Sequence, residues 1–260
     1  MRIAIGQINP TVGDLAGNRD LMTRFAVRAA EAGAGLIVFP ELSLTGYPPR
    51  DLVEKPTLIE RVEQALQELA GATSGLSLSL ICGYVGRAES TAERRAANCA
   101  AVLAGGEVVF RQQKMLLPAY DVFDEGRNFL PGEGQRIVTI GGKRIALTIC
   151  EDAWNDNDGD ASALYGRNPV EELIDAGGEV LIVINGSPYH MGKRALRREI
   201  FSATARRHRV PVVYVNQVGG NDQLVFDGSS FVLDAEGRLI GAAASFEEDL
   251  VLVDLDTGEG

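Results

Sequence analysis

Short apolar segments alternate with longer amphipathic segments along the chain. Apolar side chains recur at helical spacing in residues 18–32 and 58–69, whereas residues 2–8, 36–39 and 180–184 are mostly apolar and have the length of a strand. Amphipathic helices that alternate with buried strands are typical of an α/β layer protein with parallel strands. The pattern therefore predicts sheet structure covered by helices.

Antiparallel pairs are expected where glycine pairs interrupt this alternation. Gly105-Gly106 and Gly141-Gly142 each stand between two short apolar runs, as in β-hairpins. About ten strands in total, with helices between them, predict one domain over residues 1–260, in which two mixed sheets are sandwiched by helices. The remaining predicted elements are helices at residues 169–176 and 193–209 and strands at residues 77–85, 97–103, 107–113, 137–140, 143–148, 211–216, 229–233, 239–243 and 249–255.

The charge and cysteine content exclude several function classes. The chain has 25 Lys and Arg against 36 Asp and Glu, a net charge of −11, which repels nucleic acid and anionic lipid, so neither is an expected partner. No run approaches the ~20 apolar residues of a membrane-spanning helix, and no signal peptide is evident at the start. Cys82, Cys99 and Cys150 lack metal-ligand spacing, so we expect reduced thiols, no metal or cofactor, and a cytoplasmic protein.

Cys150 is the cysteine best placed for chemistry, because the predicted strand 143–148 delivers it to a strand end, where functional side chains gather in α/β proteins. Cys82 and Cys99 lie within apolar runs and are interpreted as core fillers. The two histidines do not favour a histidine base. His208 lies among arginines on a predicted helix, where we expect it on the surface, and no nucleophile elbow accompanies His190.

A cysteine nucleophile without histidine needs another base and a nearby cation. Glu41 directly follows the predicted strand 36–39, and Lys114 directly follows the strand 108–113. Each residue taken singly is more typical of a solvated loop. Together with Cys150 they form a set suited to amide hydrolysis, in which the ammonium group is expected to lower the pKa of the thiol.

Three short motifs resemble the signatures of the nitrilase (carbon-nitrogen hydrolase) superfamily, in the same order along the chain. The motifs are Phe39-Pro40-Glu41, Lys114 before Leu117-Pro118, and Ile149-Cys150-Glu151-Asp152. Residues 41–52, 120–125 and 186–190 further resemble the glutaminase domain of glutamine-dependent NAD synthetases. The resemblance covers nearly the whole chain and implies a four-layer α-β-β-α sandwich.

The same resemblance implies a role for each matching residue. Cys150 would attack the side-chain amide of glutamine, Glu41 would act as the general base and Lys114 as the oxyanion partner. Glu125 matches a second carboxylate that orients Lys114. The residues implied to contact the substrate are Tyr47 and Tyr120 along the pocket, and Ser187 and Lys193 at its amino-acid end.

Alternatives to glutamine hydrolysis remain open at this point. Ala119, Asp121 and Asn128 depart from the family pattern, which bears on substrate fit more than on chemistry. Another amidase of the superfamily, of the ω-amidase or carbamoylase type, is one alternative. A non-catalytic module that docks on a synthetase is another. Half-buried tyrosines such as Tyr47 and Tyr120 serve packing at least as often as binding.

The resemblance also implies partners. Synthetases of this type continue into an ATP-using domain with a Ser-Gly-Gly loop, which this sequence lacks, so an ammonia-consuming NAD synthetase domain or subunit is the expected partner. Related chains pair their helical layers, and we expect a homodimer or a higher homo-oligomer. In the dimer, Arg197 and Arg198 of the helix 193–209 would meet the acidic stretch 246–249 of a second copy. The alternative is that this helix packs its apolar face within its own subunit.

Overall fold

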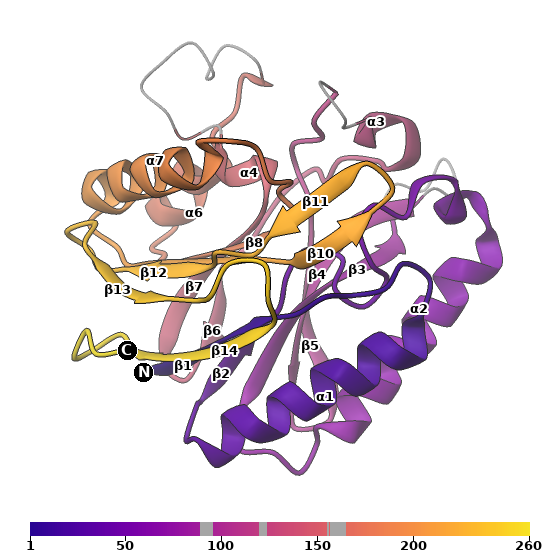
Figure 1. The fold of residues 1–260 in the computed structure, drawn as a ribbon, viewed down its shortest axis with the longest axis horizontal. Helices are drawn as coiled ribbons and strands as arrows, with labels where there is room; N and C mark the ends of the chain where they lie inside the picture. The colour runs from indigo at the N-terminus through magenta and orange to yellow at the C-terminus, as the bar shows by residue number, and fades with distance from the viewer. Residues whose placement is uncertain (89–95, 120–123, 155, 157–164) are drawn as a thin grey trace.

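The computed structural model describes residues 1–88, 96–119, 124–154, 156 and 165–260, and its elements follow the predicted alternation (Figure 1). The helices are α1 (Leu15–Glu31), η1 (Arg50–Glu54), α2 (Pro56–Ala72), α3 (Glu125–Asn128), α4 (Glu151–Trp154), α6 (Pro169–Asp175) and α7 (Lys193–His208). The strands are β1 (Arg2–Gln7), β2 (Leu36–Val38), β3 (Ser79–Arg87), β4 (Ala96–Ala104), β5 (Glu107–Gln113), β6 (Val138–Ile140), β7 (Lys143–Ile149), β8 (Val180–Asn185), β9 (Val212–Asn216), β10 (Val218–Asn221), β11 (Leu224–Asp227), β12 (Phe231–Leu233), β13 (Leu239–Ala242) and β14 (Asp249–Asp254).

Two six-stranded mixed sheets form the centre of the fold. The first has the order β14-β1-β2-β3-β4-β5, and the second has the order β13-β12-β9-β8-β7-β6. In the first sheet β1, β2 and β3 are parallel, and in the second β7, β8 and β9 are parallel. The carboxyl ends of parallel strands meet at one edge of a sheet, so residues that follow β2, β7 and β8 lie at such edges.

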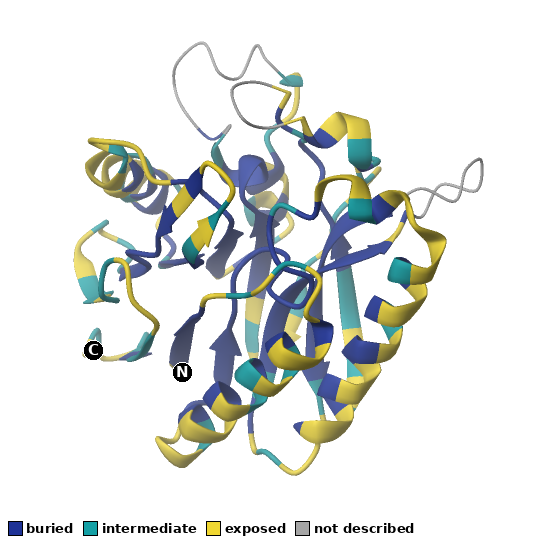
Figure 2. Ribbon diagram, turned by 45° about the vertical axis from the view of Figure 1, so that its right-hand side comes forward, coloured by how far each residue is buried: buried dark blue, intermediate teal, exposed yellow. Residues whose placement is uncertain are grey.

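The alternating side chains of the strands divide the interior into layers. In β1, Ala4 packs in the cluster that contains α1 and α2, whereas Ile3 and Ile5 pack against the second sheet. The outer face of the second sheet contacts α6 and α7 through residues such as Leu173 and Phe201. The result is the predicted four-layer α-β-β-α sandwich, in which central strands such as β2 and β8 are buried, edge strands such as β13 are partly exposed, and helices expose their outer sides (Figure 2).

The hairpin of β10 and β11 was not predicted from the sequence. Gly219 and Gly220 lie in β10, and glycine weakens the strand signal because it has low strand propensity. The two strands pair from Val218 with Asp227 to Asn221 with Leu224. The hairpin ends at Asp227, a buried acid that pairs with Arg197.

The predicted subunit interface through Arg197 is wrong, because this side chain lies inside its own subunit. Arg197 is 1% exposed, and its Nη1 donates to Asp227 Oδ1 at 2.7 Å. Its Nη2 donates to the backbone oxygens of Ser187 at 2.8 Å and Pro188 at 3.0 Å. Phe201, one turn further along α7, is fully buried in the core. The helix therefore packs its apolar face internally, which was the alternative interpretation.

His208 also differs from the expectation that it lies on the surface. Its side chain is 10% exposed, and Nε2 lies 3.1 Å from each carboxylate oxygen of Asp156. Asp156 also accepts from Asn168, which caps the start of α6. The histidine thus joins the end of α7 to α6, and the surrounding arginines concealed this role in the sequence.

Among the residues that the structure describes, no helix is both long enough and apolar enough to cross a membrane. No group of three or more His, Cys, Asp or Glu side chains in the same residues is arranged to hold a metal ion.

Replacing Arg197 with methionine should destabilise the protein strongly. The change leaves the Asp227 carboxylate buried without its partner, and breaking a buried pair in this way costs about 3–5 kcal/mol. The matched control is Arg198→Met on the same helix, which removes an exposed charge and should change the free energy of unfolding by less than about 0.5 kcal/mol. Urea unfolding of the two variants makes the comparison, and equal losses would contradict the internal role of Arg197.

Candidate active site

The ends of β2, β5 and β7 bring the predicted Glu41, Lys114 and Cys150 into one buried region. Glu41 and Lys114 are fully buried, and Cys150 is 7% exposed. Glu41 and Lys114 leave the first sheet, whereas Cys150 leaves the second. The site therefore forms where two strand edges from different sheets face each other.

Lys114 lies between two carboxylates. Its Nζ donates to Glu41 Oε1 at 2.8 Å and to Glu125 Oε2 at 2.8 Å and Oε1 at 3.0 Å. Burial by itself lowers the pKa of Lys114, but the charges of Glu125 and Glu41 outweigh it, and the pKa lies well above its usual value. Lys114 is thus a permanent cation in this site.

Glu41 is held by three hydrogen bonds. Besides Lys114, the Nδ2 of Asn98 donates to Oε1 at 2.7 Å and the backbone N–H of Gly186 donates to Oε2 at 2.7 Å. Asn98 comes from β4 and Gly186 follows β8, so the carboxylate is fixed from both sheets. Neither residue was predicted for the site, although Asn98 is a polar residue inside the apolar strand AANCAAVLA and could have been found by that signal.

The turn that carries Glu41 packs tightly against β3. Leu42 adopts a left-handed backbone conformation with φ +47°, which is uncommon for a residue with a side chain. A Cβ atom on Gly83 would lie 2.1 Å from the nitrogen of Leu42. Only glycine therefore permits this approach, which fixes the backbone position of the base.

Glu125 completes the charge cluster from α3. It is 5% exposed and accepts from the hydroxyl of Tyr47 at 3.0 Å. Burial raises the pKa of Glu125, and the nearby Glu41 raises it further, while Lys114 and Tyr47 oppose the shift. Glu125 therefore lies where the resemblance implies it, in contact with Lys114.

Cys150 sits on a sharp turn from strand to helix. Its φ is +47°, in the left-handed region, and such a conformation costs about 1–3 kcal/mol when a non-glycine residue adopts it. The N–H of Cys150 donates to Ile184 at 2.9 Å, and its carbonyl accepts from Ala153 at 3.0 Å to begin α4. Strain of this kind clusters at functional sites, which favours Cys150 over the two cysteines within strands.

The ammonium of Lys114 lowers the pKa of Cys150, as expected, but this effect does not decide the net direction. Burial and the charge of Glu41 raise the pKa of Cys150 well above its usual value, and Lys114 opposes them only in part. The resting side chain is therefore a protonated thiol rather than a thiolate. A nucleophilic role then requires a base that takes the proton as the attack occurs.

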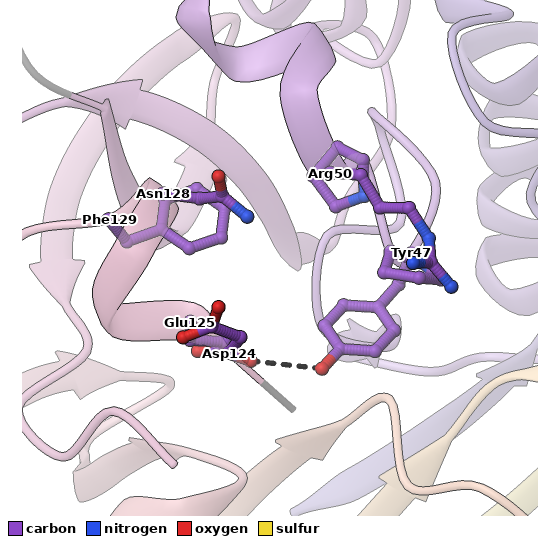
Figure 3. Close-up of a pocket in the computed structure, with 8 residues that line it drawn as sticks. Tyr47, Arg50, Asp124, Glu125, Asn128 and Phe129 are labelled. Atoms are coloured by element: carbon purple, nitrogen blue, oxygen red, sulfur yellow. Dashed lines mark hydrogen bonds between the residues drawn. The ribbon is translucent and has the colours of Figure 1, made fainter. Parts of the chain in front are cut away.

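A pocket opens beside the Glu125 end of the cluster (Figure 3). The hydroxyl of Tyr47 points at Glu125 across it, and the ring of Tyr47 packs edge-on against Phe226. Asn128, which departs from the family pattern, is one of the lining residues. The pocket is lined by Tyr47, Pro48, Pro49, Arg50, Asp124, Glu125, Asn128 and Phe129.

Two further residues predicted to contact the substrate, Ser187 and Lys193, lie outside this pocket. Ser187 is 2% exposed, and its hydroxyl oxygen accepts from Arg197 Nη2 at 3.1 Å. Lys193 lies with Nζ 5.6 Å from the centre of the Trp154 ring. Neither lines the pocket described above, and Tyr120 lies outside the described residues.

Comparison with known proteins identifies the class. Residues 2–259 match the family described as carbon-nitrogen hydrolase. A four-layer sandwich with a carboxylate, an ammonium and a thiol at its strand ends agrees with this match, and the chain belongs to the carbon-nitrogen hydrolase family.

The similar proteins indicate a narrower group within this family. The chain is 40% identical to a glutamine-dependent NAD(+) synthetase from Synechocystis sp., over 99% of this chain and 47% of that protein. The same enzyme from Thermotoga maritima is 39% identical, over 100% of this chain and 42% of that protein. This chain thus spans less than half the length of these relatives.

Solved structures of a synthetase and of an amidase are similar to this chain in fold. The glutamine-dependent NAD+ synthetase from Acinetobacter baumannii superposes with a TM-score of 0.86 at 34% identity, over 99% of this chain and 46% of that one. A mutant of the amidase from Nesterenkonia sp. AN1, which shows the result of Michael addition of acrylamide at its active-site cysteine, superposes with a TM-score of 0.81 at 25% identity, over 98% of this chain and 93% of that one.

The raised thiol pKa can be tested with methyl methanethiosulfonate, a small neutral reagent for thiolates. Its reaction rate with Cys150 should keep rising with pH and show no plateau near the ~8.5 of an ordinary cysteine. The Glu41→Gln variant should move this rise to lower pH, because it removes a charge that raises the pKa of Cys150. Cys150→Ala supplies the background from Cys82 and Cys99. A plateau below neutral pH in the unmodified sequence would show a thiolate at rest and refute the interpretation.

Proposed function

We propose that this chain hydrolyses the side-chain amide of glutamine to glutamate and ammonia through a thioester on Cys150. The observation that carries the proposal is the buried Lys114, which is hydrogen-bonded to Glu41 and Glu125. These charges interact with Cys150, which follows β7 in the other sheet. The names of the relatives from Synechocystis sp. and Thermotoga maritima favour glutamine as the amide.

In the first half of the reaction, Glu41 takes the proton of the Cys150 thiol as the sulfur attacks the carboxamide carbon. The carbonyl oxygen becomes an oxyanion, which the ammonium of Lys114 stabilises. Glu41 then returns the proton to the amide nitrogen, the carbon–nitrogen bond breaks, and ammonia leaves. The product on the enzyme is a thioester of glutamate with Cys150.

In the second half, Glu41 removes a proton from water, whose oxygen attacks the thioester carbon. The carbon–sulfur bond breaks and the sulfur regains a proton from Glu41, which restores the starting state. One carboxylate therefore serves both halves, and its three hydrogen bonds keep it in place throughout. Glu125 orients Lys114, and Tyr47 orients Glu125.

The ammonia would be used by an NAD synthetase domain or subunit, which is the partner that we propose. The relatives named glutamine-dependent NAD(+) synthetase are more than twice as long as the aligned region, and ammonia is the product that such a partner consumes. The contacts of Ser187 and Lys193 with the amino-acid end of glutamine, and of Tyr120 along the pocket, also remain part of this proposal.

Ammonia release from glutamine by the purified chain tests the activity. Cys150→Ala should abolish release, because the covalent route is lost, and Glu41→Gln should lower it by about 10²- to 10⁴-fold through lost proton transfer. The matched control is Cys82→Ala, a buried cysteine in the helix-facing core of the first sheet, which should keep full activity. Hydrolysis of simple amides such as propionamide, with none of glutamine, would favour the amidase alternative. No hydrolysis of any amide would favour a docking module.

We also propose that the chain forms a homodimer, although not through Arg197. Large apolar side chains are exposed near the start of α7, with Leu196 at 47%, Tyr189 at 47% and Phe246 at 55% exposure. The rings of Tyr189 and Phe246 lie 5.2 Å apart. Light scattering should show a dimer, and Leu196→Glu should weaken it, whereas the distant exposed change Val109→Glu should not. A monomer at micromolar concentration would overturn this proposal.

A further inference from the structure

Asp152 is a buried acid that the proposed reaction leaves without a role. It lies two residues after Cys150 and is 1% exposed. Although it is close to the thiol in sequence, its carboxylate bonds to backbone N–H groups. Its Oδ1 accepts from Leu116 at 2.7 Å and from Met115 at 3.0 Å, and its Oδ2 accepts from Ile149 at 3.3 Å.

These three N–H groups belong to the two chain segments that carry the reactive side chains. Met115 and Leu116 directly follow Lys114, and Ile149 directly precedes Cys150. The first segment leaves β5 in one sheet, and the second leaves β7 in the other sheet. Asp152 therefore bridges the two sheets at the point where ammonium and sulfur must be held at a fixed separation.

The backbone of Lys114 is otherwise bonded to residues that precede β6. Its N–H donates to Asn98 at 2.8 Å and its carbonyl accepts from Gly132 at 2.8 Å. These contacts fix Lys114 relative to β4, but they do not fix it relative to β7. The bonds from Asp152 supply that second constraint.

We propose that ionised Asp152 is a positioning residue that sets the distance between Lys114 Nζ and Cys150 Sγ, and thereby the rate of the proposed amide hydrolysis. An acceptor at both oxygens is essential, because each faces an N–H donor. Protonation of Asp152, or its replacement by asparagine, converts one of these acceptor oxygens into an O–H or N–H donor. That donor then faces a backbone N–H group and cannot bond to it. The bridge then opens.

The charge of Asp152 changes close to neutral pH. Burial raises the pKa of Asp152 to about 7, against the opposing effects of the N–H donors and of the Lys114 ammonium. Arg167, which precedes α6, is another charged group that interacts with it. Above this pH the carboxylate is ionised and the bridge is intact. Below it the proton is bound and the bridge weakens, so the rate falls as the pH falls.

The test compares Asp152→Asn with the unmodified chain in glutamine hydrolysis across pH. A displacement of about 1 Å costs about 100-fold in rate, so kcat should fall by that order while KM stays nearly constant, since the pocket residues are untouched. The unmodified chain should lose kcat below a pH of about 7, and the variant should lack this dependence. Asp152→Glu keeps the charge with a longer side chain, and it should lower kcat yet retain the acid limb. The control is Asp175→Asn, an exposed acid at the end of α6.

A second measurement keeps this inference separate from the choice of substrate. In Asp152→Asn the ammonium moves away from the sulfur, so the pH dependence of methyl methanethiosulfonate modification at Cys150 should shift to still higher pH. This readout needs no hydrolysis of glutamine, so it holds even where the proposed function fails. Unchanged thiol titration in folded Asp152→Asn, a loss confined to KM, or an acid limb that persists in that variant would overturn the inference. Should Asp152→Asn not fold, the same thiol titration in Asp152→Glu decides, because an unshifted curve there shows that the bridge does not set the distance.

Discussion

The ammonium group of Lys114, buried between Glu41 and Glu125, is the interaction on which the rest of this site depends. Two carboxylates without a cation could not remain ionised together in the protein interior, because burial of unpaired charge is too costly. The remaining oxygen positions are filled by Asn98, Gly186 and Tyr47, from β4, from the end of β8 and from the segment before η1. The hydrogen bonds that these charged groups require therefore connect segments that are far apart in the sequence.

The layered fold decides where these charges meet the sulfur. Glu41 and Lys114 belong to the first sheet, whereas Cys150 belongs to the second, so their separation depends on how the inner faces of the sheets pack. That packing is made by branched apolar side chains, which fill space but carry no directional preference. Directional bonds near the site, such as those of Asp152, add the precision that apolar contact lacks.

Much of the fold follows from local patterns in the sequence. Apolar runs, glycine pairs and amphipathic repeats have short range, and they located most strands and the long helices within a few residues. The β10–β11 hairpin escaped because its glycines weaken the strand pattern. The placement of Glu41, Lys114 and Cys150 at strand ends was predictable for the same local reason.

Contacts between residues far apart in the sequence, and the pKa values that depend on them, were not predictable from these local patterns. Arg197 and His208 have the sequence context of surface residues, and only the tertiary structure brings Asp227 and Asp156 against them. The thiol pKa is a sum of burial and several opposing charges, so its direction depends on distances that no motif contains. Asp152 lies two residues after Cys150 in the sequence, but only the structure shows that its carboxylate accepts from the backbone N–H groups of Met115 and Ile149.

A cysteine that keeps its proton at rest is poorly oxidised. Peroxide attacks the thiolate, and the first product, a sulfenic acid, leads on to irreversible acids. Burial raises the pKa of Cys82 and Cys99 to about 12, and Cys150 is shifted in the same direction. A raised pKa keeps the thiolate fraction of all three cysteines low, and the nucleophile that we propose gains thiolate character when Glu41 takes its proton.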